Sequence, residues 1–501
     1  MDMNSGLWLY LPSCGLFLIS FWICYRVRKH SGLIKYLFGG NNWKLAFTSN
    51  IGSPFSLTMF LFTVVPLGYI YGAPLIIVAV ISFIIAMPLA LSIISSPAFE
   101  RFYFKDDSFD RHNFSIIDFI GFSLGGATKT IFGLVVLIYL FIYLLAEFSL
   151  IRLSYSVIFP NAPVSAFIFI LGFMSICFMY TFLGGFVGIL LTDRWQLIYI
   201  LLSIFVILHL NPKLYNILYD NSYSLYAFTA NQIRPKEICR YIALLIYVIS
   251  WLIGGVDFWA RNVCTLRNKS VESLAIVKYS TAAIVLCGIL MLIIGIQIKS
   301  VNFINVKADE LDLPFLILEK SAIRLSALAK GFLLAGLAAA CFTTIDTLII
   351  SFTQTYYSLI KDIKKANSTK LFFPNPIAVQ IILFFAATCT SFCVTRANVN
   401  IWFTFFVHLV FILTAILIFG VYFRKIYTQY LGPGGIVVSL ILIYAIQIFD
   451  FLFTRWLCNF EVFIYVPICS LLISSGLITI YKKIRLYHYG KSLIRLKKDG
   501  N

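Results

Sequence analysis

Predominantly apolar stretches of about twenty residues follow one another along the whole chain, and they restrict its fold more than any other feature. A helix of about 20 apolar residues crosses the hydrocarbon core of a bilayer, so each stretch is a candidate membrane span. The polar segments between them are too short to fold as separate soluble domains. Backbone polar groups in a bilayer need partners within the chain, and continuous apolar runs satisfy them as helices.

The composition supports this interpretation and narrows the possible partners. Hydrophobic residues make up 60% of the chain and charged residues 12%, whereas soluble proteins carry about 25% charged residues. A formal net charge of +18 is compatible with nucleic-acid binding, but the basic residues cluster in alternate loops, as in membrane proteins. We therefore expect one integral membrane unit in the lipid bilayer, with no nucleic-acid partner.

The runs predict an all-α polytopic membrane protein with about thirteen transmembrane helices. The predicted spans are 7–25, 45–67, 70–95, 128–153, 164–182, 185–210, 238–260, 272–298, 325–358, 372–394, 399–423, 433–453 and 460–481. If these spans alternate, the most basic loops and the tail 482–501 share one side, which the positive-inside rule makes cytoplasmic. We expect the N-terminus outside and the C-terminus inside a plasma or inner membrane, with the basic tail as a headgroup anchor.

Two predicted spans contain helix-breaking residues. Residues 49–54 read SNIGSP, and the seventh span contains Gly254 and Gly255 followed by Asp257. A helix break leaves backbone N–H and C=O groups without their helical hydrogen bonds, and a bilayer tolerates such groups where they line a protein cavity. Simple kinks are one interpretation, and broken helices of an inverted repeat that meet at the membrane midplane are the more specific one.

Few ionisable residues lie inside the spans. A charge at mid-membrane costs about 2.5–3.5 kcal/mol on insertion scales, so such residues usually face an interior path or a partner. We interpret Asp193 and Asp346 as functional, and we leave Glu147 and Asp257 open between functional and structural roles. Asp450, near a span end, is interpreted as structural.

The segment around Asp346 carries a stripe of hydroxyl groups. Ala340, Thr343, Thr344 and Thr347 stand at i, i+3, i+4 and i+7, which places them on one helical face beside Asp346. Hydroxyl and carboxylate oxygens are ligands that suit a hard cation such as sodium. The alternative is hydrogen bonding of each threonine to the carbonyl four residues before it.

Three motifs resemble the sodium:solute symporter family, which includes sodium/proline, pantothenate, sialic acid and glucose carriers. They are YTFLGG followed by TDRWQ (180–185 and 192–196), AAACFTTIDT (338–347) and SNIGS (49–53). The resemblance implies a LeuT-type 5+5 inverted repeat with broken helices. Its first half would be 45–210 and its second 238–423, with an extra helix at 7–25 and two more within 433–481.

The resemblance also implies two sets of sodium ligands. The first set combines the backbone carbonyls of Thr48, Ile51 and Ala340 with the hydroxyls of Thr343 and Thr344. A further set comprises Asp193, Thr343, Asp346 and Thr347. Arg194 departs from the apolar residue usual in the family and offers Asp193 a partner.

These patterns favour a secondary active transporter. The predicted activity is sodium-coupled symport, by alternating access, of a small polar solute such as an amino acid, sugar or vitamin. Alternatives are a lipid-linked saccharide flippase, a polytopic membrane enzyme, and a degenerate or repurposed member of the symporter family. We expect no enzyme activity, no catalytic residue and no cofactor beyond sodium as the coupling ion. Weaker candidates for solute contacts are Asn50, Glu147, Trp251, Asp257 and Trp259, where an acidic group would meet an amine.

Overall fold

The computed structural model describes most of the chain as helices. The described residues are 3–28, 36–37, 49, 56–72, 74–102, 115–160, 164–209, 235–263, 271–300, 313–323, 325–366, 375–395, 399–449, 466–482 and 484. Regular structure within these ranges is helical throughout, as the sequence predicts.

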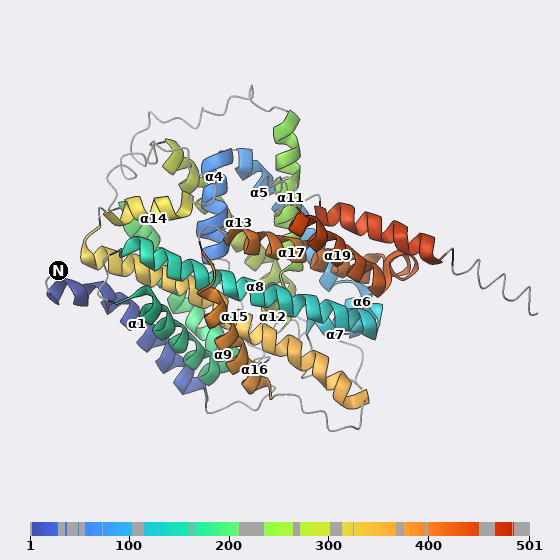
Figure 1. The fold of residues 1–501 in the computed structure, drawn as a ribbon, viewed down its shortest axis with the longest axis horizontal. Helices are drawn as coiled ribbons and strands as arrows, with labels where there is room; N and C mark the ends of the chain where they lie inside the picture. The colour runs from blue at the N-terminus through green and yellow to red at the C-terminus, as the bar shows by residue number, and fades with distance from the viewer. Residues whose placement is uncertain are drawn as a thin grey trace, which may run out of the picture.

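The helices are α1 (Met3–Val27), the π-helix η3 (Leu57–Val64), α4 (Val65–Tyr71), α5 (Pro74–Ile94), α6 (Pro97–Glu100), α7 (Ile116–Leu124), α8 (Gly126–Ile158), α9 (Ala166–His209), α11 (Pro235–Gly254), α12 (Val256–Val263), α13 (Val271–Ser300), α14 (Leu313–Ile323), α15 (Ala327–Ala366), α16 (Pro376–Ser391), α17 (Val399–Tyr422), α18 (Arg424–Ile426), the π-helix η7 (Tyr427–Leu431) and α19 (Gly432–Phe449) (Figure 1). A further apolar helix covers Val466–Lys482.

Apolar side chains cover the outside of this helical assembly, while polar side chains lie inside it. In the described part of the chain, eight helices are long and apolar enough to cross a membrane, and four shorter apolar helices accompany them. Leu18, Ile168 and Ile441 are each more than 60% exposed, as side chains that face lipid tails would be. The protein is therefore an integral membrane protein. The count of about thirteen spans stays a prediction.

Helix α15 forms the centre of the assembly and lies against α9, α8 and α1 (Figure 1). Every residue of its central stretch, from Leu333 to Ser351, is buried. Small residues allow this close packing, since a Cβ on Gly336 would meet the Ser203 side chain and approach the Tyr199 carbonyl oxygen at 3.0 Å. Because protein surrounds this stretch of α15 on every side, it can carry polar groups on several faces without exposing them to lipid.

Two helix breaks in the described chain occur at glycines, and one of them is a predicted interruption. Helix α9 joins the two predicted spans 164–182 and 185–210 through Gly185, whose φ of +54° breaks the helical geometry. The seventh predicted span is likewise divided, because α11 ends at Gly254 and α12 begins at Val256. Of the interruption predicted at 49–54, the structure describes Ser49 alone.

Some boundaries differ from the predicted spans. Helices α7 and α14 lie outside them, and α15 continues to Ala366, beyond the predicted end at residue 358. A capping box begins α7, in which the Ser115 backbone N–H donates to the Asp118 carboxylate. The start of this short helix is therefore set by local capping, which a search for long apolar spans does not detect. Asp450 lies outside the described residues.

Candidate functional site

Two fully buried carboxylates from different helices define the candidate site. Asp193 lies on α9 beyond the break at Gly185, and Asp346 lies on α15. The two side chains are close enough to interact electrostatically. The hydroxyl of Ser49, within the first predicted interruption, donates to Asp193 Oδ2. The structure thus brings the three motif segments of the sequence together.

Hydrogen bonds hold Asp346 at both of its oxygens. The Tyr180 hydroxyl, from the first half of α9, donates to Asp346 Oδ2 at 2.9 Å. The Thr347 backbone N–H donates to Asp346 Oδ1 at 2.6 Å. Gln196 Nε2 donates to the Tyr180 oxygen at 3.3 Å, which links the two halves of α9 across their break. Tyr180 and Gln196 stand inside the motifs that the sequence singled out, although no role was assigned to them there.

Two acceptor oxygens in this cluster lack a hydrogen-bond partner among the described residues. They are Asp193 Oδ1 and Gln196 Oε1, and both residues are fully buried. A buried acceptor without a donor is costly, and most such groups in proteins bind water, an ion or a ligand. A carboxylate and an amide oxygen are suitable ligands for a hard cation.

The predicted threonine stripe lies fully inside the protein. The Thr344 hydroxyl donates to the Ala340 carbonyl oxygen four residues before it at 3.3 Å, which is the local hydrogen bonding that the sequence left open as an alternative. The Thr343 hydroxyl donates to the same oxygen at 3.0 Å, three residues before it. A hydroxyl that donates its hydrogen keeps lone pairs for a cation, so these contacts are compatible with ion binding. Thr48 and Ile51, the other members of this predicted set, lie outside the described residues.

Arg261 is a part of the site that the sequence-based prediction missed. This arginine of α12 is 3% exposed and donates through one terminal nitrogen to Thr347 Oγ1 at 2.7 Å and to the Thr343 carbonyl oxygen at 3.3 Å. It also acts electrostatically on both carboxylates. The predicted seventh span ended at residue 260, one position short of it. Arg194, by contrast, is exposed beside the buried Asp193, and Arg261 is the arginine that acts on this carboxylate.

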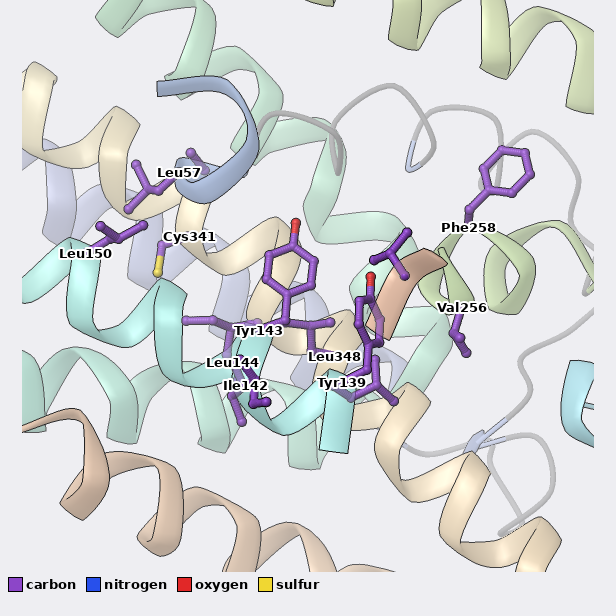
Figure 2. Packing of buried hydrophobic residues seen from close by; sticks show 14 of the residues in the cluster. Leu57, Tyr139, Ile142, Tyr143, Leu144, Leu150, Val256, Phe258, Cys341 and Leu348 are labelled. Carbon is purple, nitrogen blue, oxygen red and sulfur yellow. The ribbon is translucent and has the colours of Figure 1, made fainter. Parts of the chain in front are cut away.

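Glu147 lies at a second buried position, between α8 and the start of η3. Its Oε1 accepts the Thr58 backbone N–H at 3.0 Å, and its Oε2 has no hydrogen-bond partner among the described residues. The Tyr143 hydroxyl nearby donates to Ser56 Oγ at 3.0 Å. The Cys341 thiol of α15 donates to the Glu147 backbone carbonyl oxygen at 3.6 Å, and Figure 2 shows Leu57 beside Cys341, so this position faces the same central helix as the carboxylate cluster.

The other predicted solute contacts are not gathered around Glu147. Trp259 is buried and its indole nitrogen donates to the Ile253 carbonyl oxygen at 2.6 Å, which satisfies a backbone group at the end of α11. Trp251 is half-buried and lines an apolar pocket between α4, α5, α11 and α13. Asn50 and the side chain of Asp257 lie outside what the structure describes.

Comparison with known proteins identifies the fold. No protein-family model matches the chain. The structure of a Na⁺-coupled sialic acid symporter, in a substrate-bound outward-open state, is similar with a TM-score of 0.66 at 15% identity, over 95% of this chain and 98% of that one. A manganese transporter variant from Eremococcus coleocola gives a TM-score of 0.47 at 13% identity over 95% of each chain, which is too distant to support a conclusion. The first similarity confirms the predicted LeuT-type helical fold.

Proposed function

We propose that this protein is a secondary active transporter that couples the movement of a small polar solute to that of sodium. The observation that carries the proposal is the pair of unpartnered oxygens, Asp193 Oδ1 and Gln196 Oε1, buried beside Asp346 inside a membrane protein. The similarity in fold to a Na⁺-coupled sialic acid symporter supports the same class of function.

Two sodium sites are proposed around α15. The first would use the Ala340 carbonyl and the hydroxyls of Thr343 and Thr344, together with the carbonyls of Thr48 and Ile51. The second would use Asp193 and Asp346, together with Thr343 and Thr347. Hard oxygen ligands favour sodium over softer metals at both.

Coupling follows from the different elements that meet at the cluster. Asp193 and Ser49 belong to the proposed first repeat (45–210), whereas Asp346 and Arg261 belong to the second (238–423). An ion that contacts both repeats binds best in the conformation that brings them together. If the solute favours the same conformation, each ligand increases the affinity for the other by the same factor.

Glu147 is the proposed solute contact. Its free Oε2 would accept a hydrogen bond from an amine or hydroxyl group of the solute, while Thr58 holds Oε1 in place. A buried acceptor next to the start of a helix suits a small polar solute, since directed polar groups give such sites their specificity. The solute class remains amino acid, sugar or vitamin-like.

The test is uptake into proteoliposomes that contain the purified protein. A panel of labelled amino acids, sugars and vitamins is offered with an inward sodium gradient, and with potassium in place of sodium. We expect sodium to stimulate uptake of at least one solute, and Asp193→Asn to reduce that stimulation at least tenfold. Arg194 is an exposed neighbour of Asp193, so Arg194→Gln serves as the matched control and should retain the stimulation by sodium. Uptake that is equal under all ion gradients, and unchanged in Asp193→Asn, would contradict the proposal.

A further inference from the structure

The guanidinium group of Arg261 lies where oxygen ligands of the second proposed ion site converge. One of its terminal nitrogens donates at once to the Thr347 hydroxyl and to the Thr343 carbonyl oxygen, at 2.7 and 3.3 Å. Thr347 in turn donates its backbone N–H to Asp346 Oδ1. A positive group therefore already contacts oxygens that a bound cation would use on this side of the cluster.

The helix break at Gly255 directs Arg261 into the core. Helix α12 starts directly after it, and Trp259 fastens the join through its bond to the Ile253 carbonyl oxygen. Gly254 lets α11 approach α17, since a Cβ there would lie 2.8 Å from the Val410 carbonyl oxygen. The short helix packs against α15, where Arg261 meets the threonines. The position of the guanidinium thus follows from the fold rather than from a flexible side chain at a surface.

The charges of the cluster do not cancel. Asp346 accepts hydrogen bonds at both oxygens, from Tyr180 and from the Thr347 N–H, as an ionised carboxylate does. Asp193 also accepts, from Ser49. Among the described groups of the cluster, two ionised carboxylates and one guanidinium, which is always protonated, leave one negative charge in a buried position. A buried net charge requires a compensating charge. The unpartnered Asp193 Oδ1 is the atom at which the negative charge can still bind a cation.

We propose that Arg261 is a built-in cation, which replaces one exchangeable ion on the Asp346–Thr347 side of the cluster. The second proposed sodium site is then narrowed to its Asp193 side, because Arg261 already contacts Thr343 and Thr347. The cluster accepts a single monovalent cation there, held by Asp193 Oδ1 and Gln196 Oε1. Arg261 in this role determines how many ions the protein binds, and through the proposed function it determines how many ions accompany each solute. The ion count of the cluster follows its net charge.

Equilibrium binding of ²²Na⁺ to the purified full-length protein in detergent tests this count. Arg261→Met removes the fixed cation and should bind one sodium ion more per protein than the wild type. Asp346→Asn removes one carboxylate and should bind one fewer. The double variant Arg261→Met/Asp346→Asn restores the net charge and should return to the wild-type number. Arg261→Lys retains the charge and should also match the wild type.

Arg194→Met is the matched control, because it removes an exposed arginine next to Asp193 and should leave the count unchanged. The proposal is overturned if folded Arg261→Met binds the same number of ions as the wild type. Should that variant fail to fold, unchanged binding in Asp346→Asn overturns it. A wild type that binds no sodium while Arg261→Met binds one would support the built-in cation and contradict sodium coupling. If the wild type takes up solute with sodium but Arg261→Met binds no extra ion, sodium coupling is supported and the built-in cation is contradicted.

Discussion

Replacement of Asp118 by asparagine should destabilise the protein, because one carboxylate joins three helices. Asp118 of α7 is 5% exposed, and its Oδ1 lies 2.7 Å from Lys129 Nζ of α8. Its Oδ2 lies 3.1 Å from Lys361 Nζ of α15 and accepts the Ser358 hydroxyl at 2.7 Å. Asparagine keeps the shape and one acceptor oxygen, but it removes the charge that both ammonium groups face.

The magnitude follows from distance and burial. At an effective dielectric constant of 20, a pair 2.7 Å apart attracts with about 6 kcal/mol before desolvation is counted. Removal of one partner from a buried ion pair costs about 3–5 kcal/mol, since the other charge stays buried. The Lys361 side chain is 23% exposed, so water compensates part of its lost ion pair; the Lys129 side chain, at 8% exposed, loses more stabilisation. We expect a net loss of about 3 kcal/mol, which lowers the melting temperature by about 3 °C if all 501 residues unfold in one step.

Thermal melting of the detergent-solubilised protein, followed by fluorescence-detected size-exclusion chromatography, measures this loss. The control is Asp118→Asn combined with Lys129→Met, which removes the buried ammonium together with its carboxylate. This double variant should melt higher than Asp118→Asn alone, because the two positions are coupled. The reasoning is refuted if Asp118→Asn melts like the wild type, or if the double variant loses the sum of the two single losses.

Two further predictions concern the proposed ion site and the orientation. Thr343→Val or Thr344→Val removes an oxygen ligand with a contribution on the order of 1–3 kcal/mol, and should raise the half-maximal sodium concentration for uptake about tenfold, whereas serine at either position should be nearly silent. Equal sodium dependence in the wild type and both valine variants would remove the sodium site from this face. A reporter fused after Asn501 should be active only in the cytoplasm, and one in the loop 211–236 only outside; the opposite pattern would overturn the orientation.

Features that local sequence encodes were predicted well. A carboxylate within an apolar run stands out because of its cost in lipid, and this identified Asp193 and Asp346, which the structure buries completely. Consecutive glycines identified the break between α11 and α12, because glycine weakens a helix wherever it occurs. The span boundaries followed from hydropathy within a few residues for most helices.

Contacts between distant helices could not be predicted in this way. Tyr180 was quoted within a motif, but its partner Asp346 lies 166 residues away along the chain. Arg261 stands in a helix of eight residues that crosses the end of the predicted span at residue 260, and its partners Thr343 and Thr347 lie more than 80 residues away along the chain. Trp251 and Trp259 were both assigned to a cavity, yet one lines an apolar pocket and the other binds a backbone carbonyl. Aromatic residue type does not specify which neighbour a side chain meets.

The central position of α15 explains how one ion can act on several parts of the fold. Its polar residues leave the helix in different directions, since Asp346 contacts Tyr180 of α9 while Thr347 contacts Arg261 of α12. Both partner helices lie next to a break at a glycine, Gly185 within α9 and Gly255 before α12. Hinge motions concentrate at such positions, where few backbone bonds resist a change of direction. Under the proposed function, a cation at Asp193 holds α9 against α15 while Arg261 holds α12 there. Release of the ion then frees the contact between α9 and α15, while Arg261 keeps α12 in contact with α15.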